Sequence, residues 1–517
     1  MAQDVYFTSN PAEFTQVEGL YVVEKDPPGF IQGADLGATG IAGICVRGPS
    51  TVQWISSTAR FLEVYGGRDR GSGGALVGEV WRSLLNKRFG SLYIRRVIAT
   101  DADTGHVHVE EGVDGAGTEV LKVAASSPGD WAADVGWKVE DASDGDANHF
   151  NLVVRYLGET VTYENLNIKT ASDDNLAEVI GDDVANWVTV TKLADGRPAN
   201  NSTVTETDFV AARDADDFVQ IAAIGAAYTT NVGDDGTAVS ADYISAITDL
   251  AYTPGPYCCF VAGASVDQNA LNGTLVTLAP LVADKAFLTW SGTHGQVVAT
   301  ESANKGTDIT TASGRIWWCF NSAYTLDPET GLEIQVPPHE WMAGICSQTD
   351  VDVHPGDRAN AQYCAGIRRL ANETLTRADL VALRAAGIST LEKLPDGAFL
   401  FRSAVVTDTT TGKTEIARRR SADYLILSAS DRLRYYVKSK NTLENRAQMA
   451  GELVAFSNAL KDASRIIEDF AIDQSMNTDA SRGQGIEKIR WDVRLIGHML
   501  HLILESTIGT TVTIEES

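Results

Sequence analysis

The stretch "GIAGICVRGPSTVQWISSTARFLEVYGG", residues 40–67, decides the fold class that the sequence predicts. It opens with an apolar run that ends at Gly48 and Pro49, which is typical of a buried strand followed by a turn. From Ser56 onward it predicts a short helix with a serine cap, because a serine hydroxyl accepts hydrogen bonds from the free N–H groups of a first helical turn. A strand that leads into a helix begins an α/β domain.

The α/β pattern continues on the C-terminal side of this stretch. Apolar residues recur at helical spacing at Val77, Val80, Trp81, Leu84 and Leu85, and "SLYIRRVIA" predicts the next strand. Near residue 219 the pattern returns, with a strand in "FVQIAAIG" and a helix face formed by Tyr243, Ile244, Ile247 and Leu250. Further strands are predicted in "PYCCFVAGA", "KAFLTWSG" and "GRIWWCFNSAY". We therefore predict a discontinuous α/β core domain made of residues 21–100 and 216–400.

A different pattern separates the two halves of this core. Short alternating strands split by Gly and Asp occur in "EVLKVAASSPGDW", "VGWKVEDAS" and "FNLVVRYLGETV", all within residues 101–215. The loops between them are rich in acidic residues. The sequence therefore predicts an inserted β-rich domain over residues 101–215.

The C-terminal part combines helix and strand patterns. The segment "GAFLFRSAVVTDTTTGKTEIARRRSADYL" resembles a hairpin, and a long helix with a heptad-like apolar stripe follows, formed by Met449, Leu453, Phe456, Leu460, Ile467 and Phe470. This predicts an α+β C-terminal domain over residues 401–508. Both ends of the chain alternate like half-buried strands: "DVYFTSN" in residues 1–20 and "GTTVTIEES" in residues 509–517. These ends are predicted to be extended terminal arms.

Composition and charge exclude several classes of function. With 44% hydrophobic and 21% charged residues over 517 positions, the chain has the composition of a folded protein. Its formal net charge of -27 disfavours direct contact with nucleic acid or with an anionic membrane, because binding phosphate needs a basic surface. No apolar run is long enough to predict insertion into a bilayer. The first residues do not resemble a secretory signal, and no CxxC pair suggests a zinc ribbon, so we expect synthesis in a reducing cytosol.

Patterns that carry catalytic or metal chemistry are weak. The glycine-rich "GGRDRGSGGALVGEV" lacks the Gly-Lys-Ser/Thr ending of a phosphate-binding loop, and His339 with Glu340 lacks a second histidine at metal-binding spacing. His498, His501 and Glu505 would share a face if that segment is helical, but a packing face explains them more simply. We predict no catalytic, cofactor-binding or metal-binding residue. An enzyme, for instance a cytosolic hydrolase with a β insertion, stays the alternative, because catalytic residues can lie far apart in sequence.

Several motifs, in order along the chain, resemble the contractile tail sheath family of bacteriophages, which is related to the sheaths of contractile injection systems. They are "VRGPSTVQWISSTARFLEVYGG", "FGSLYIRRV", "LKVAASSPGDWAADVGWKV", "VPPHEWMAGICSQTDV" and "AAGISTLEKLPDGAFLFRSA". The resemblance spans roughly residues 21 to 517. This sequence departs from the family pattern at two places. "GAFLFRSA" replaces the usual Gly-Ala-Arg-Thr sequence, and "PPGF" stands where the family has Pro-Gly-Val.

The resemblance implies a structural, non-enzymatic role. Sheath subunits of this family form a helical polymer of rings around a tail tube in a metastable extended state, and the polymer contracts to drive the tube through the host envelope for genome delivery. The implied partners are other copies of the chain, the tail tube protein, and the baseplate and tail terminator proteins, with no cofactor. The implied location is the tail of a virion that assembles in the host cytoplasm. The insertion would face outward and the C-terminal domain would face the tube.

In this family the terminal arms add strands to a sheet in neighbouring subunits, a mode of binding in which backbone hydrogen bonds supply strength. The resemblance thus implies intersubunit roles for the arm residues Val5, Tyr6, Phe7, Val512 and Ile514. The alternative is that each end pairs within its own chain or is disordered. Gly509 and "PPGF" are the predicted joints of the two arms.

Two further groups of residues are candidates for contacts between subunits. Basic residues gather early in the C-terminal domain: Arg418, Arg419, Arg420, Arg432, Arg434, Lys438 and Lys440. They are predicted to dock an acidic surface of the tube or of an adjacent subunit, and the alternative is a solvated basic face. Cys45, Cys258, Cys259 and Cys319 lie in predicted core strands. Cys346 and Cys364 lie in segments that could reach the surface and form intersubunit disulfides in an oxidising medium.

Overall fold

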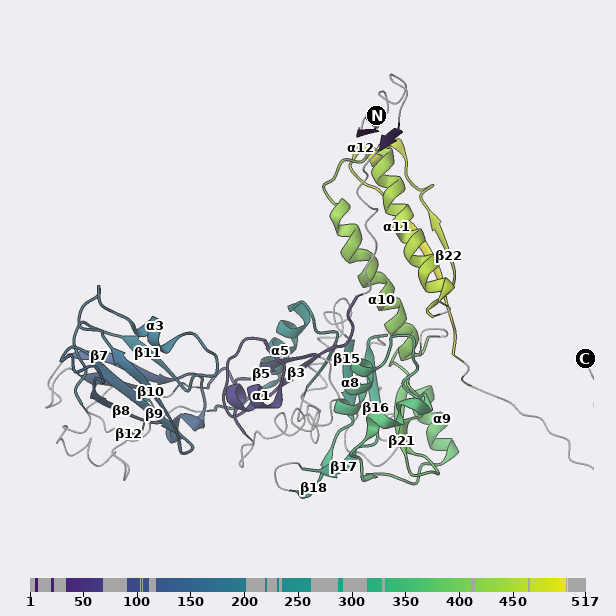
Figure 1. Ribbon diagram of the computed structural model, residues 1–517. Helices are drawn as coiled ribbons and strands as arrows, with labels where there is room; N and C mark the ends of the chain where they lie inside the picture. The colour runs from purple at the N-terminus through teal and green to yellow at the C-terminus, as the bar shows by residue number, and fades with distance from the viewer. Residues whose placement is uncertain are drawn as a thin grey trace, which may run out of the picture. The chain divides into compact units, whose positions relative to one another are not determined.

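The computed structural model describes residues 5–7, 20–22, 34–67, 91–102, 104, 106–110, 118–200, 219–220, 230–231, 235–261, 287–291, 314–327, 331–410, 414–463, 465–498 and 500. The chain forms two compact units. The larger is Asp35–Arg419, and the smaller joins Met1–Ala34 to Arg420–Ser517 (Figure 1).

An eight-stranded sheet with the order β21-β20-β16-β15-β14-β3-β5-β4 is the centre of the larger unit. Its strands are β3 (Ala38–Gly43), β4 (Gln53–Ile55), β5 (Ser91–Arg96), β14 (Cys258–Val261), β15 (Phe287–Ser291), β16 (Ile316–Phe320), β20 (Ile388–Lys393) and β21 (Phe399–Phe401). The strands from β20 to β5 run parallel, and the edge strands β4 and β21 are antiparallel. Every residue of β3 and β16 is buried, as expected for strands in a covered parallel sheet. A mixed α/β fold is therefore confirmed.

Helices cover this sheet. The predicted serine cap is present: Ser57 accepts a hydrogen bond from the Arg60 N–H at 3.2 Å and starts α1 (Thr58–Tyr65). Helix α5 (Ser240–Tyr252) contacts β3, β5 and β14, and α8 (His339–Gln348) contacts β14 and β15. Helix α9 (Arg377–Ala385) lies on β20. The helix predicted around Val77 to Leu85 lies outside the described residues.

A short sheet and a 3-10 helix complete this part of the larger unit. The sheet has the order β18-β17-β19, formed by Glu333–Val336, Ala323–Leu326 and Arg369–Leu370. The 3-10 helix η5 spans Arg358–Cys364 and contacts α8.

The inserted segment forms two four-stranded antiparallel sheets, β10-β9-β8-β12 and β11-β7-β6-β13. Their strands are β6 (His106–Glu110), β7 (Glu119–Ala125), β8 (Gly136–Asp141), β9 (Phe150–Tyr156), β10 (Glu159–Leu166), β11 (Val188–Lys192), β12 (Val219–Gln220) and β13 (Thr230–Asn231). The short elements η2 (Asp130–Asp134) and α3 (Leu176–Ile180) accompany them. Buried residues such as Val123, Trp137 and Leu152 form one core in this part of the chain.

One sheet assignment made from the sequence was wrong. The strand in "FVQIAAIG" was predicted to open the second half of the α/β core, but Val219 pairs with Trp137 of β8, in a sheet of the insertion. Thr230 likewise pairs with Val107 of β6. A short apolar run shows that a strand is favourable, but its sheet is decided by long-range packing, which no local pattern encodes.

Two buried arginines join the insertion to the core within the larger unit. Arg96 of β5 donates hydrogen bonds to the carbonyl oxygens of Cys45 at 3.0 Å and Gly48 at 3.2 Å in the core, and of Pro128 at 2.9 Å in the insertion. Arg47 donates to the Ala185 carbonyl at 3.3 Å. Burial lowers the pKa of both guanidinium groups. The carbonyl partners are needed because a buried cation without hydrogen bonds would be strongly unfavourable.

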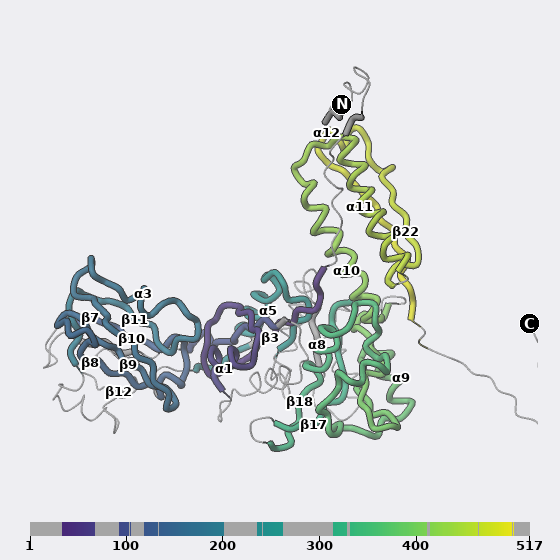
Figure 2. Tube along the Cα trace, viewed as in Figure 1, coloured from purple at the N-terminus to yellow at the C-terminus, as the bar shows by residue number. Residues whose placement is uncertain are grey.

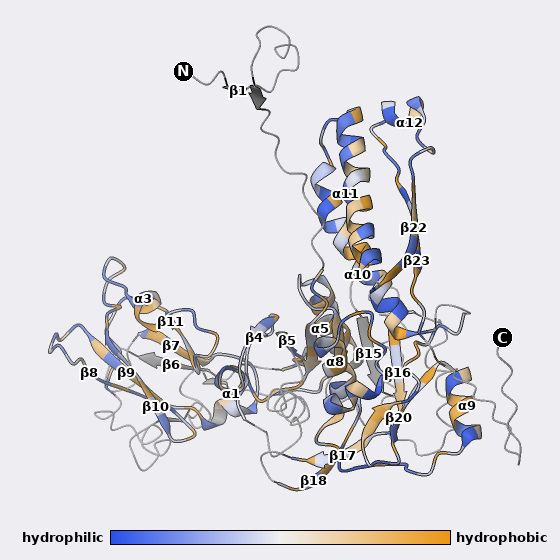
Figure 3. Cartoon of the chain, turned by 45° about the vertical axis from the view of Figure 1, so that its right-hand side comes forward, coloured by the Kyte–Doolittle hydropathy of each residue, from blue (hydrophilic) through white to orange (hydrophobic). Residues whose placement is uncertain are grey.

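The smaller unit consists of helices and a hairpin (Figure 2). Its elements are β1 (Val5–Phe7), β2 (Leu20–Val22), α10 (Ile416–Leu433, which enters it at Arg420), η6 (Arg434–Tyr436), α11 (Leu443–Asp462), β22 (Ile467–Asp473), α12 (Asp479–Gly483) and β23 (Arg490–Leu495). Strands β22 and β23 form an antiparallel two-stranded sheet that lies against α11. Hydrophobic and hydrophilic residues alternate around α11 (Figure 3). No helix among the described residues is long and apolar enough to cross a bilayer.

One prediction about this unit needs correction. The heptad-like stripe was assigned to one helix, but α11 ends at Asp462, so Ile467 and Phe470 lie on β22. A seven-residue spacing suits both a helix and a strand, and the tertiary contacts selected one.

The hairpin-like segment before α10 is confirmed only in part. Val405 and Glu415 of the larger unit pair in antiparallel fashion, but the segment from Ile416 onward, which includes the arginine run, is helical, in α10.

Candidate assembly surface

A buried carboxylate holds the two long helices of the smaller unit together. Glu452 of α11, only 3% exposed, accepts hydrogen bonds from Arg432 Nε at 3.0 Å and Nη2 at 2.9 Å, and from the Tyr436 hydroxyl at 2.7 Å. The bond to Glu452 raises the pKa of Arg432. Burial, followed by the Glu452 contact, raises the pKa of Tyr436 to about 12. The end of α10 and the turn after it are therefore fixed to α11 by charge-assisted bonds.

The connection between these helices presents an exposed tip that is both apolar and basic. Three large apolar side chains are exposed here: Tyr435 by 74%, Val437 by 67% and Leu443 by 75%. The neighbouring cations Arg434 and Lys438 are also exposed. Large apolar side chains that stay in water next to cations are typical of a protein interaction surface. We call residues 434–443 the basic tip.

The structure divides the predicted basic cluster. Arg434, Lys438 and Lys440 are exposed on the basic tip, whereas Arg432 is committed to Glu452. Arg420 is 1% exposed, and Arg418 and Arg419 are partly buried. The prediction of one continuous docking face was therefore wrong for Arg420, because successive residues of a helix point in different directions and Arg420 lies on the side of α10 that carries the buried Ile416 and Ala417.

The two-stranded sheet has one apolar and one charged face. Along β23 the exposed residues Arg490, Asp492 and Arg494 alternate with less exposed Trp491, Val493 and Leu495. Trp491 faces α11: its Nε1 donates to Ser457 Oγ at 3.1 Å, and its ring centroid lies 6.3 Å from that of Phe456. On β22, Phe470 pairs with Val493 and Ile472 with Trp491, so these side chains share the face toward α11.

The sheet of β22 and β23 has two strands among the described residues. Among the described residues no third strand pairs with the outer edge of β22 or of β23. Two strands alone are marginally stable, and each unpaired edge exposes a row of backbone donors and acceptors that can pair with an added strand. The sheet lies against α11, and among the described residues both of its edges are without a paired strand.

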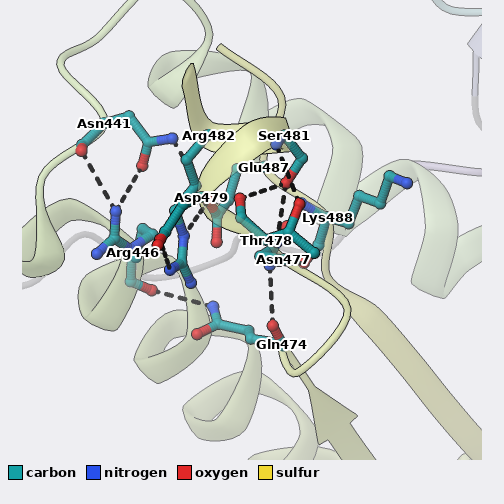
Figure 4. Close-up of polar contacts among 10 residues, drawn as sticks. All are labelled: Asn441, Arg446, Gln474, Asn477, Thr478, Asp479, Ser481, Arg482, Glu487 and Lys488. Carbon is teal, nitrogen blue, oxygen red and sulfur yellow. Dashed lines mark hydrogen bonds and ion pairs between the residues drawn. The ribbon is translucent and has the colours of Figure 1, made fainter. Parts of the chain in front are cut away.

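The long connection between β22 and β23 is held by polar contacts (Figure 4). Asn477 Nδ2 donates to the Lys488 carbonyl at 2.7 Å, and the Lys488 N–H donates to Asn477 Oδ1 at 2.7 Å. Thr478 caps α12 by accepting from the Ser481 N–H at 3.1 Å. Gln474 Nε2 donates to the Arg446 carbonyl at 3.3 Å, which joins this connection to α11. The positions of both hairpin strands are thereby fixed at this end of the sheet.

The predicted arm residues are only partly described. Val5, Tyr6 and Phe7 form β1, which pairs in parallel with Leu20–Val22 of the same chain. This is the within-chain alternative considered for the N-terminal arm, so its exchange with a neighbour stays a prediction. Val512 and Ile514 lie outside the described residues, as do Gly509 and "PPGF".

The cysteines and the histidine candidates do not form a chemical site among the described residues. Cys346 and Cys364 are 1% and 2% exposed, which contradicts the expectation that they reach the surface. His339 and Glu340 are buried on α8, and His498 lies in an irregular segment after β23, whereas His501 and Glu505 are not described. No group of three potential metal ligands is present in the described part of the chain.

Solved structures share this fold although no family model and no curated protein matches the sequence. The sheath tail protein of Desulfitobacterium hafniense superimposes with a TM-score of 0.56 at 15% identity, over 92% of this chain and 100% of that one. The sheath tail protein of Listeria innocua gives a TM-score of 0.57 at 12% identity, over 86% and 90%. The contracted helical sheath of the anti-feeding prophage gives a TM-score of 0.52 at 12% identity, over 95% and 99%. The chain therefore has the fold of contractile sheath proteins.

Proposed function

We propose that this chain is a structural subunit of a contractile tail sheath, with no enzymatic role. The observation that carries the proposal is the extent of the shared fold: sheath proteins align with nearly the whole chain and over nearly their own full length. A sheath subunit must bind copies of itself, and a sheet of two strands, with no third strand paired to it among the described residues, is suited to that task. The subunits would surround a tail tube, attach to baseplate and terminator proteins, and form part of a virion or of a related injection device.

In the proposed mechanism the free energy of contraction is stored in the lattice. The extended polymer is metastable, and contraction repacks the contacts between subunits that move as nearly rigid bodies. The terminal arms keep neighbours connected during that movement, so that rearrangement passes from ring to ring. The proposed arrangement has the insertion facing outward and the C-terminal domain facing the tube.

Electron microscopy of the purified protein tests this proposal. Negatively stained protein, alone and with its tube protein, is expected to show helical tubes whose diameter changes on contraction. Compact particles of a single size under all conditions would contradict the proposal and would favour the enzyme alternative.

The basic tip is the proposed contact with an acidic surface of the tube. Its apolar side chains would be desolvated in the contact, and its cations would set orientation and rate of encounter. Reversal of charge in Arg434→Glu with Lys438→Glu is expected to reduce the length of sheath assembled around tubes, most strongly at low salt. A matched control is Arg368→Glu with Arg377→Glu, which reverses two exposed cations of the larger unit. Equal assembly by both double variants would overturn the proposed contact.

A further inference from the structure

A groove of about 720 Å³ lies in the inserted segment, beside helix α3 and strand β11. All five residues of β11, Val188–Lys192, line it, and Leu176, Ala177 and Ile180 of α3 line it as well. Successive side chains of a strand point to opposite faces, so one cavity can border five consecutive residues only along the edge of the strand. Helix α3 contacts β11 and lies next to it in Figure 1. The groove therefore follows the edge of β11 that does not face β7.

The backbone of β11 presents donors and acceptors along this edge. Just outside the strand, the Trp187 carbonyl accepts from the Ser126 N–H at 3.0 Å, and the Leu193 N–H donates to the Val120 carbonyl at 2.9 Å. Alternate residues of an antiparallel strand bond to the same neighbour, so the odd-numbered residues of β11 bond to β7. The even-numbered residues direct their N–H and C=O groups toward the groove; they are Val188, Val190 and Lys192. Among the described residues no strand pairs with this edge.

Apolar side chains line the groove between its ends. Ile180 of α3 and Val190 of β11 are half-buried and pack against the core of the insertion. Val184, in the connection from α3 to β11, is 36% exposed. Apolar side chains at alternate positions of an added strand would remove this surface from water, which is favourable.

Carboxylates lie at both ends of α3. Asp174 precedes the helix and Asp182 follows it; both line the groove and both are exposed. Among the described residues no cation forms an ion pair with either carboxylate, whereas Asp183 is paired with an arginine of α1 at 2.7 Å. Lys192, the one cation among the described lining residues, is paired with Asp195 at 2.6 Å. The ends of the groove therefore carry negative charge that a basic ligand would neutralise.

We propose that this groove binds an extended segment of a basic partner protein, which adds as a further strand to the edge of β11. In such binding the backbone hydrogen bonds give affinity, and the pockets for alternate side chains give specificity. The matching segment alternates apolar and polar residues and carries Lys or Arg near each end. A second copy of this chain is a poorer occupant, because its net charge of -27 would be repelled. The inference goes beyond the proposed function and does not depend on it.

A short synthetic peptide is the probe. The five residues of β11 span about 17 Å at roughly 3.3 Å per residue, and acetyl-Lys-Thr-Val-Thr-Val-Thr-Lys-amide is long enough to reach past both ends. Its sequence reads the same in both directions, so it suits parallel and antiparallel addition alike. Fluorescence anisotropy of the labelled peptide is expected to show saturable binding to the full chain. Replacement of both lysines by glutamate is expected to weaken binding about tenfold or more.

Methylation of the peptide backbone tests the hydrogen bonds themselves. One peptide carries N-methyl groups on both valines, and a second carries them on the two threonines that flank the central one. In an added strand the N–H groups of alternate residues point to β11 and the others point away. One methylated peptide is therefore expected to lose binding while the other keeps it. Equal binding by the two would show that the peptide does not add as a strand.

Variants of the chain locate the site. Asp174→Lys with Asp182→Lys is expected to weaken binding about tenfold, and Val190→Pro, which removes one N–H group of the edge, by at least as much. The matched control is Asp134→Lys with Glu164→Lys, which reverses two exposed carboxylates of the insertion that do not line the groove. Circular dichroism checks that each variant is folded. If Val190→Pro is not folded, the methylated peptides test the same hydrogen bonds from the side of the ligand.

The outcomes separate the possible occupants. No binding of the peptide to the full chain, or equal weakening by the control variant, would overturn the proposal. Self-association of the wild-type chain that Asp174→Lys with Asp182→Lys abolishes, measured by sedimentation, would show that a second copy fills the groove and that the basic partner is wrong. A chain that binds the peptide as described but never forms sheaths would contradict the proposed function alone.

Discussion

At the scale of single residues, the buried ionic network around Glu452 is the feature on which the basic tip depends. The carboxylate is almost fully buried, and its three hydrogen bonds come from Arg432 at the end of α10 and from Tyr436 of η6. Removing one member of such a network leaves the others without a partner in a poorly hydrated place. Arg432, Tyr436 and Glu452 therefore affect both the position of the basic tip and the stability of the smaller unit.

Replacement of Glu452 by alanine is expected to lower the free energy of unfolding by about 2 to 4 kcal/mol, because Arg432 loses its buried partner. Denaturant unfolding followed by circular dichroism would measure the change. Asp479→Ala is the control: Asp479 is fully exposed and lies 3.8 Å from Arg482, so its removal should change stability by less than about 0.5 kcal/mol. Similar effects of both substitutions would refute the role given to Glu452.

The raised pKa of Tyr436 predicts a dependence of stability on alkaline pH. Burial and the bond to Glu452 favour the protonated phenol, and the folded-state pKa is about 12 against 10.0 for an unperturbed tyrosine. The folded chain thus holds this proton more tightly than the unfolded chain. The stabilisation is complete below about pH 10 and is lost as pH rises from there to about 12. Tyr436→Phe should flatten this part of the stability profile, and an unchanged profile would count against it.

The burial of Arg420 could not be predicted from the charge pattern of the sequence. The run Arg418 to Arg420 predicted a basic surface, and Arg420 is buried. Sequence patterns predict charge and average exposure, but the direction of one side chain on a helix depends on which face meets a neighbour. The signal that was available is periodicity: Arg420 lies in register with Ile416 and Ala417, both buried on α10.

At the scale of elements, the hairpin of β22 and β23 is stabilised by its contact with α11. Its inner face is anchored by Trp491, which contacts Ser457 and Phe456. The sequence pattern predicted the helix and its apolar stripe, but the predicted stripe also included Ile467 and Phe470, which lie on β22. An apolar residue every few positions fits a strand as well as a helix, and the end of α11 depends on packing.

Loss of the Trp491 ring is expected to release the hairpin from α11. Trp491→Ala should lower the free energy of unfolding by about 2 kcal/mol, less than for a fully buried tryptophan, because this ring is partly exposed. Amide hydrogen exchange should become faster in β22 and β23 and stay unchanged in the central sheet of the larger unit. Trp491→Phe keeps much of the packing and should have a smaller effect. Unaltered exchange in the hairpin of the alanine variant would show that another contact anchors it.

At the scale of the whole molecule, negative charge is distributed unevenly along the chain. Residues 420–517 contain 12 Lys or Arg and 14 Asp or Glu, a net charge of -2, so the preceding residues carry -25 of the total of -27. A strongly acidic surface keeps free subunits soluble through mutual repulsion. The nearly neutral C-terminal part can then make contacts between copies without that repulsion.

The order of motifs along the chain predicted the fold better than any single pattern. The strand and capped helix of residues 40–67, the parallel core strands and the β-rich insertion are all present. These elements are specified by local patterns that the sequence shows directly. The sheet joined by Val219, the burial of Arg420 and the pairing of β1 are decided by contacts between distant residues, which local patterns do not contain.

Deletion of residues 510–517 is the prediction that concerns the molecule as a subunit. The described elements of both units precede the deletion, so the shortened chain should fold and stay soluble with an unchanged melting temperature. It should not polymerise, because a neighbouring copy would then receive no strand from this arm. The control is Thr511→Ser with Thr513→Ser, which keeps the alternation of apolar and polar residues. Sheaths of normal length that contract normally, built from the shortened chain, would show that strand exchange by this arm does not hold the polymer together.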